Sequence, residues 1–149
     1  MTKTLKMLLA AGMTSLALLA AVPCQADDMT SPEAVYADIE KTFGAVPSFV
    51  KAIPKAALPG VWQLTKQLEL SETTALPPKT KALISLAVAA QIPCEYCIYA
   101  DTLAAKRAGA SDEEIAEAVA MAGLTRNMST IFNGLQVDLT QFKKEMGGS

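Results

Sequence analysis

The sequence contains no histidine among its 149 residues. Serine-histidine-aspartate and cysteine-histidine catalysis both use an imidazole as the proton acceptor, so neither arrangement can be built here. Histidine-ligated zinc is excluded for the same reason. Cysteine is scarce, with three in the chain, and no second Cys-x-x-Cys pair exists to complete a structural zinc site. We therefore expect no bound metal and no cofactor.

A concentrated positive charge is also missing. The chain has 13 lysines and arginines against 15 acidic residues, a net charge of −2, and its basic residues form no cluster. Proteins that bind nucleic acids concentrate lysine and arginine to match the phosphate backbone. We therefore expect no nucleic-acid partner.

The first 26 residues have the pattern of a secretory signal peptide. Lys3 and Lys6 precede an uncharged apolar run over residues 8–22, and small residues stand near position 26. The run is shorter than the roughly 20 residues of a membrane-spanning helix. Lipid attachment at Cys24 is an alternative, but Pro23 directly before it fits that signal poorly. We predict a cleavable signal peptide over residues 1–26 and a periplasmic protein.

The mature chain over residues 27–149 has the size of one domain with its own core. Cleavage would leave 123 of the 149 residues and remove two of the 13 basic but none of the 15 acidic side chains, giving a net charge of −4. No other stretch is long and apolar enough to cross a bilayer. We therefore expect no membrane contact after cleavage.

Helix signals dominate this domain, and no segment shows the alternation of a strand. Ser31 and Pro32 predict a helix start, Gly44 its end, and Ser111 with Glu114 a capping box. Gly123 is expected to bend or end the helix that begins there. The predicted fold is all-α, with a short helical turn around Phe49 and Val50, between Pro47 and Pro54, and helices over residues 32–43, 58–70, 79–91, 94–108, 111–123 and 128–144.

The patterns also predict which faces are buried. In the helix over residues 58–70, Trp62 is expected in the core, and so is the face formed by Val61, Leu64 and Leu68. Residues 79–91 (KTKALISLAVAAQ) are apolar almost all round after the first turn. A helix of this kind is buried in a bundle or at an interface between subunits, which indicates that the protein self-associates.

Cys94 and Cys97 stand at the start of a predicted helix, directly after Pro93. A spacing of three places both sulfur atoms on one helical face, about 5–6 Å apart between Cβ atoms, within reach of a disulfide after a small adjustment. The helix N-terminus stabilises a thiolate at Cys94. The pair can therefore attack a substrate and resolve the product. The alternative is a fixed structural disulfide, although such a small loop gains little stability from closure.

Residues 77–123 contain this Cys-Glu-Tyr-Cys motif between an apolar helix and the Ala-Gly-Ala-Ser-Asp-Glu-Glu-Ile segment. This region resembles the core of the AhpD-like alkylhydroperoxidase and carboxymuconolactone decarboxylase superfamily. The lead-in over residues 39–47 resembles the smaller members. The resemblance implies a helical bundle that assembles as a trimer or hexamer. It also implies hydroperoxide reduction, with Cys97 as attacker, Cys94 as resolver, and a dithiol or thioredoxin-like reductant. The position of Cys94 at the helix N-terminus favours Cys94 as the more acidic thiol, so the order of the two cysteines stays open.

Two positions depart from the peroxidase pattern of that superfamily. Asp101 stands where the pattern has histidine, and Ala82 stands where it has glutamate. Asp101 can accept a proton in principle, but its charge disfavours a nearby thiolate. Glu95 and Asp101 could form a carboxylate pair, although two separately solvated acids are the simpler interpretation.

Three functions therefore stay open from the sequence. The first is an exported thiol oxidoreductase that uses Cys94, Cys97 and Asp101. The second is a non-enzymatic helical module whose disulfide is structural. The third is a lyase of the carboxymuconolactone decarboxylase type, a branch that usually lacks the Cys-x-x-Cys pair.

Overall fold

The computed structural model describes residues 29–147, and this part of the chain is helical without a strand. The all-α prediction of about six helices is confirmed. The signal peptide, Cys24 and the cleavage site lie outside the described residues, and no described helix has the length and apolar character to span a membrane. The elements are α1 (Pro32–Phe43), the 3₁₀ helix η1 (Ser48–Ala52), α2 (Leu58–Leu64), the π-helix η2 (Thr65–Glu69), α3 (Pro78–Gln91), α4 (Glu95–Arg107), α5 (Asp112–Gly134) and α6 (Leu139–Glu145).

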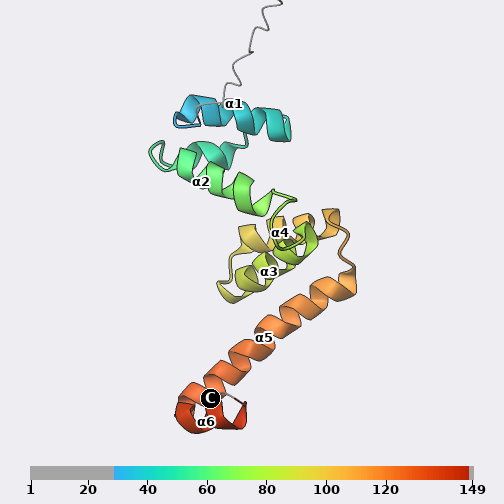
Figure 1. Cartoon of the computed structure of the whole chain (residues 1–149). Coiled ribbons are helices and arrows are strands. Elements are labelled where there is room, and N and C mark those ends of the chain that lie inside the picture. Colours follow the sequence, from blue (N-terminus) through green and yellow to red (C-terminus); the bar gives the residue numbers. More distant parts are fainter. Residues whose placement is uncertain (1–28, 148–149) are drawn as a thin grey trace, which may run out of the picture.

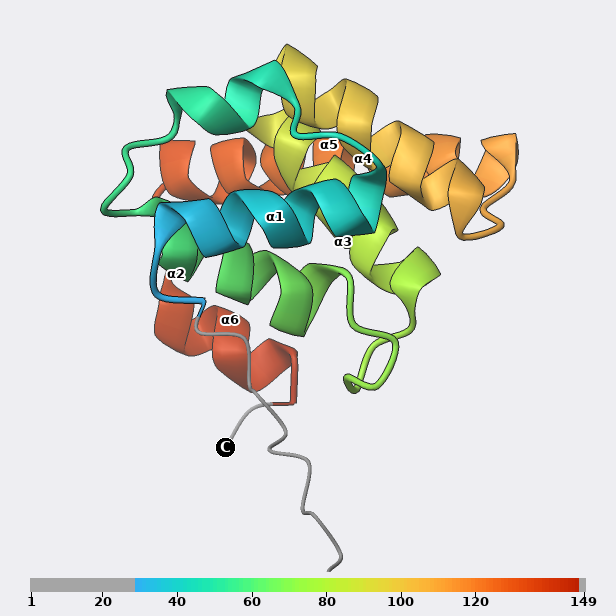
Figure 2. The ribbon, with the colours of Figure 1, turned by 90° about the horizontal axis from the view of Figure 1, so that it is seen from above.

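The helices are arranged in tiers (Figure 1). α1 and α2 pack against each other at one end, and α3 and α4 form a hairpin in the middle. α5 packs mainly on α3 and then runs on to α6 at the opposite end. Seen from above, α1 crosses over the α3–α4 hairpin, and α5 passes beneath it (Figure 2). Cys94 and Cys97, the two cysteines of the sequence motif, therefore lie in the middle tier.

α1 begins and ends where the sequence predicts. The Ser31 hydroxyl accepts a hydrogen bond from the Ala34 amide at 3.2 Å, and Gly44 ends the helix with a left-handed φ of 82°. Its buried face is Val35 and Ile39, one turn apart. These residues belong to a core cluster confined to the N-terminal helices, with members Val35, Ile39, Val50, Leu58 and Trp62.

The predicted inner face of the second helix is wrong, although Trp62 is buried as expected. Val61, Leu64 and Leu68 are 46%, 63% and 54% exposed. Leu58 and Trp62, one turn apart, face α1 instead. The helix then loosens into a π-turn, in which the Leu70 amide donates to the Thr65 carbonyl at 2.9 Å. Apolar periodicity alone does not reveal the hydrogen bond from the Trp62 indole to the Asp38 carboxylate, which holds Trp62 on the side of α1.

α3 packs on α4 and α5 through small side chains. Its buried residues are Ala82, Leu86 and Ala89, and Ala105 is buried from α4. Small side chains allow the helix axes to approach closely. Ile84 and Val88 are about half exposed, at 49% and 52%, so the helix is not buried on every side within one chain.

α5 starts with the predicted capping box, in which Ser111 and Glu114 exchange hydrogen bonds of 3.1 and 2.8 Å. Glu114 also pairs with Lys79 at 2.8 Å and so ties α5 to α3. The helix does not end at Gly123, one of the two predicted outcomes, because α5 is a single helix of 23 residues from Asp112 to Gly134. α6 then folds back so that Phe142 packs on Phe132, with ring centroids 5.4 Å apart.

Candidate redox site

The turn between α3 and α4 is held from two sides. The Cys94 amide donates to the Ala89 carbonyl at 3.0 Å, which bends the chain out of α3. Arg126 on α5 donates to the Gln91 side chain at 2.6 Å and to its backbone carbonyl at 3.2 Å. Pro93 cannot donate a backbone hydrogen bond, so the helix is interrupted at this point. The turn therefore presents Cys94 as the N-cap of α4.

Cys94 and Cys97 form a disulfide across the first turn of α4, with their Cα atoms 5.3 Å apart. The Cys97 amide donates to the Cys94 sulfur at 3.2 Å. In the reduced protein the same amide and the positive end of the helix would stabilise a Cys94 thiolate. The expectation that this spacing favours pairing therefore agrees with the structure.

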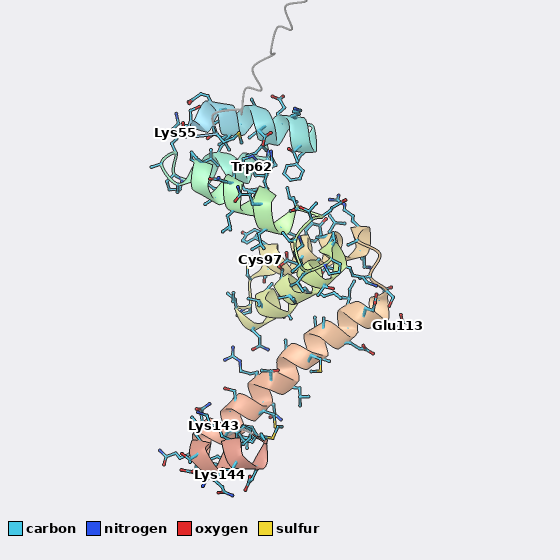
Figure 3. All side chains as sticks on the ribbon, in the orientation of Figure 1. Lys55, Trp62, Cys97, Glu113, Lys143 and Lys144 are labelled. Atoms are coloured by element: carbon cyan, nitrogen blue, oxygen red, sulfur yellow. A yellow bond between two sulfur atoms is a disulfide. The ribbon has the colours of Figure 1, made fainter. Side chains whose placement is uncertain are left out.

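The disulfide lies at the surface of the chain (Figure 3). Cys97 is exposed and Cys94 is partly buried. Tyr96 and Tyr99, which stand beside the two cysteines in the sequence, are 89% and 75% exposed in the single chain. An external thiol or a small substrate can therefore reach Cys97 more easily than Cys94.

The two positions that depart from the peroxidase pattern lie on neighbouring helices. Ala82 is buried on α3, so its methyl group is packed and supplies no proton acceptor. Asp101 lies one turn after Cys97 on α4 and is partly buried. Burial raises the pKa of the Asp101 carboxyl above its ordinary value of 3.8. A carboxyl group of this kind holds a proton more readily than a solvated aspartate.

A second carboxylate near this site was missed by the sequence analysis. Glu69, at the end of η2, is exposed as a whole residue, yet enough protein surrounds its carboxyl group to raise its pKa by desolvation. The negative charge of Asp101 raises this pKa further, and Lys81 on α3 opposes the shift. The neighbour of Asp101 is thus Glu69 and not the exposed Glu95. No pattern in the sequence links positions 69 and 101, because the packing of η2 against α3, which sets how near the two carboxyl groups are, belongs to the tertiary fold.

A shallow surface groove runs along another face of α4 and encloses about 490 Å³. It is lined by Glu95, Ile98, Tyr99, Thr102, Leu103 and Lys106, and neither cysteine belongs to it. Within residues 29–147, no three cysteine or acidic side chains come together in a way that could hold a metal ion. The groups that the fold brings to the site are the Cys94–Cys97 disulfide and the carboxyl groups of Asp101 and Glu69.

The model of the carboxymuconolactone decarboxylase family matches residues 57–138, more than half of the chain. The chain belongs to this family. The matched region begins just before α2 and includes α3, α4 and α5, whereas α1 precedes it.

A solved structure supports this family assignment. The crystal structure of the alkylhydroperoxidase AhpD core from Rhodospirillum rubrum is 31% identical, with a TM-score of 0.63. The match covers 72% of this chain and 81% of that one. No match was found among curated proteins. The predicted superfamily and its AhpD-like fold are thus confirmed.

Proposed function

We propose that this family member is an exported, thiol-dependent oxidoreductase that reduces organic hydroperoxides through Cys94 and Cys97. The observation that supports the proposal is the exposed disulfide at the N-terminus of α4 in a chain that resembles an alkylhydroperoxidase core. A helix N-terminus that lowers a thiol pKa is the environment of a reactive cysteine pair.

In the proposed reaction, the Cys97 thiolate attacks one oxygen of the hydroperoxide and the O–O bond breaks. The organic part leaves as an alcohol after taking up a proton, and Cys97 becomes a sulfenic acid. The Cys94 thiolate then attacks the Cys97 sulfur, forming the disulfide and releasing water. A dithiol reductant reduces the disulfide and is itself oxidised. The hydrogen bond from the Cys97 amide to the Cys94 sulfur stabilises the Cys94 thiolate. Cys94 is therefore the better leaving group when a reductant attacks the exposed Cys97.

The alternative of a structural disulfide is favoured by one observation. Neither Ala82 nor Asp101 supplies the glutamate and histidine of the peroxidase pattern. The reduction potential of the Cys94–Cys97 couple separates the two functions. A value above about −300 mV supports the redox role, and a value well below it indicates an inert structural bond.

Substitution at position 101 tests the peroxidase activity directly. Asp101→His places an imidazole one turn from Cys97, where it can take the thiol proton at neutral pH. Acid–base assistance by a positioned side chain is typically about 10²–10⁴-fold, so turnover of an organic hydroperoxide should rise by at least about tenfold. Cys97→Ser and Cys94→Ser are the controls. Wild-type turnover equal to that of both controls would contradict the proposal.

The proposal also includes the surroundings of the protein. Export to the periplasm after cleavage at residue 26 accounts for a cysteine pair that is kept as a disulfide between turnovers. A thioredoxin-like dithiol is the reductant. A second copy of the chain is the partner that covers the apolar side chains exposed on α5, α6 and the turn between them, among them Leu124, Leu135 and Leu139. N-terminal mass analysis of protein from the exporting cell tests the first point, because a lipid-modified Cys24 would contradict it.

A further inference from the structure

The proposed reaction needs a group that takes the proton of Cys97, yet the sequence has no histidine. Asp101 follows Cys97 by four residues on α4, a spacing that places their Cβ atoms about 5–6 Å apart. In Figure 3 Cys97 lies on the side of the α3–α4 hairpin that faces α2. η2, which continues α2, also contacts α3 at this level.

Lys81 fixes the end of η2 against α3. Its ammonium group donates to the Leu68 carbonyl at 2.6 Å, to the Thr74 hydroxyl at 2.9 Å and to the Ser71 carbonyl. Leu68 is the residue directly before Glu69. Two of these three hydrogen bonds end on backbone carbonyls, so Lys81 holds the backbone on either side of Glu69. Glu69 is thus kept within electrostatic range of Asp101.

We propose that Asp101 and Glu69 together accept and return the proton of Cys97, in place of the missing histidine and glutamate. Asp101 is the catalytic group, because it lies beside the reacting sulfur. Glu69 is a positioning residue that acts on Asp101 through its charge, because η2 is held against α3 within electrostatic range of that carboxyl group. The inference rests on the peroxide reduction proposed above and names the residues that make it possible.

The electrostatics of the pair fit this role. Desolvation raises the pKa of both carboxyl groups, and the charge of Asp101 raises that of Glu69 further. Two neighbouring carboxylates resist ionising together, so a pair of this kind retains one proton to higher pH than either group alone. The charged group acting from α3 is Lys81, which partly opposes the shift. A proton carrier works best when its pKa approaches the working pH.

The proton balance closes within the pair. The Cys97 thiol gives its proton to the ionised carboxylate, and the sulfur electron pair forms the S–O bond with the hydroperoxide. As the O–O bond breaks, the departing alkoxide takes the proton back from the carboxylic acid. The carboxyl pair ends in its starting state, and Cys97 has been oxidised to sulfenic acid.

Two measurements on the same variants test this role. Glu69→Gln and Asp101→Asn each remove one carboxylate while keeping the shape of the side chain. The first measurement is iodoacetamide alkylation of Cys97 against pH, in protein that also carries Cys24→Ser and Cys94→Ser. The second is hydroperoxide turnover with a dithiol reductant in protein with both active-site cysteines. Glu72→Gln is the matched control, because it removes an exposed carboxylate three residues from Glu69.

We expect the two measurements to move in opposite directions. Removing a negative charge favours the Cys97 thiolate, so alkylation near neutral pH should become at least about twofold faster. Turnover should nevertheless fall by about tenfold or more, because the proton carrier is lost. Glu72→Gln should change neither rate. A merely structural role would lower both rates, and a merely electrostatic one would raise both.

The failure of this inference can be told apart from the failure of the proposed function. Unchanged alkylation in both variants would show that the pair does not act on Cys97 and would overturn the inference. Faster alkylation together with unchanged or faster turnover would overturn it as well. Wild-type protein without cysteine-dependent turnover would overturn the proposed function and this inference together.

Discussion

Asp38 joins α1 to α2 through two different donors. Its carboxylate accepts from the Trp62 indole at 2.7 Å and from the Lys66 ammonium at 2.8 Å. The hydrogen bond from Lys66, followed by that from Trp62, holds the pKa of Asp38 below its ordinary value of 3.8, against the opposing effect of burial. Without the Asp38 carboxylate, the indole N–H of Trp62 would lose this hydrogen-bond acceptor at the edge of the N-terminal core.

Asp38→Ala should therefore destabilise the protein at neutral pH. Leaving a largely buried indole N–H without its acceptor costs about 1–3 kcal/mol. The pKa of Asp38 is lowered by folding, so its contribution is present above pH 3.8 and is lost as the pH falls through the lower value in the folded protein. Urea unfolding at pH 7 and at lower pH measures the difference. A loss of stability equal to that of exposed Glu40→Ala, or one that grows toward low pH, would contradict this account.

The contributions of Glu69 and Asp101 to folding stability should change with pH in the opposite sense to that of Asp38. Folding raises the pKa of both carboxyl groups above 4.5 and 3.8, so their protonated forms are favoured in the folded protein. Their contribution to the stability of the folded protein is therefore complete when the pH is below the ordinary pKa values. It is lost as the pH rises through the raised pKa values of the folded protein. Glu69→Gln should therefore raise the melting temperature at pH 7 and leave it unchanged near pH 3. A lower melting temperature at pH 7 would contradict the prediction.

Some residues of the site could be predicted from the sequence, and one could not. The spacing of Cys94 and Cys97 after Pro93 predicted their pairing, because the relation is local to one helical turn. Asp101 was found through the resemblance, because it stands where the peroxidase pattern has histidine. Glu69 was not found, since its proximity to Asp101 depends on the π-turn of η2 and on the hydrogen bonds of Lys81. Local patterns cannot predict a pair that only the tertiary fold creates.

The helix boundaries show the same difference. Boundaries set by hydrogen bonds within one turn could be predicted from the sequence, and those that depend on packing between helices could not. The serine caps at Ser31 and Ser111 were predicted correctly, because a cap is decided by hydrogen bonds within one turn. Gly123 predicts a bend or an end of the helix, yet α5 continues through it to Gly134. A glycine within a helix costs only about 1 kcal/mol relative to alanine, which the packing of α5 on α3 can offset.

Gly123→Ala should therefore stabilise the protein. A Cβ atom at this position meets no atom within 4 Å, and the backbone does not adopt a positive φ. The gain should be about 0.5–1 kcal/mol, from the smaller entropy of the unfolded chain and the better helix former. Gly109→Ala is the contrasting control, because Gly109 has a φ of 83° and alanine is strained there. Thermal unfolding that shows both variants shifted in the same direction would count against this explanation.

On the scale of the whole molecule, the C-terminal part of the chain has much apolar surface in contact with water. Neither α5 nor α6 contains a fully buried residue. Exposed apolar side chains extend along both helices and the turn between them, including Leu124 at 51%, Leu135 at 74% and Leu139 at 63%. Large apolar patches of this kind mark interaction surfaces, and a second copy of the chain is the occupant we propose.

Leu124→Glu should weaken this self-association. A charge placed on the apolar face of α5 must be desolvated when two chains meet, so the dissociation constant should rise by at least about tenfold. Asn127→Glu, which adds the same charge at an exposed polar position of the same helix, should have a smaller effect. Light scattering over a range of concentrations measures the mass. A wild-type protein that is monomeric at micromolar concentration would contradict the proposed assembly.

The buried side chains of the described residues fall into two sets without a common member. One is the N-terminal cluster around Ile39 and Trp62, and the other is the contact of α3 with α4 around Leu86 and Ala105. Because the two sets share no member, we expect each to lose its packing without the other, as two cooperative units in hydrogen exchange. Amide protons of α1 and α2 can exchange through an opening of their own, at a rate independent of the unit that holds the disulfide.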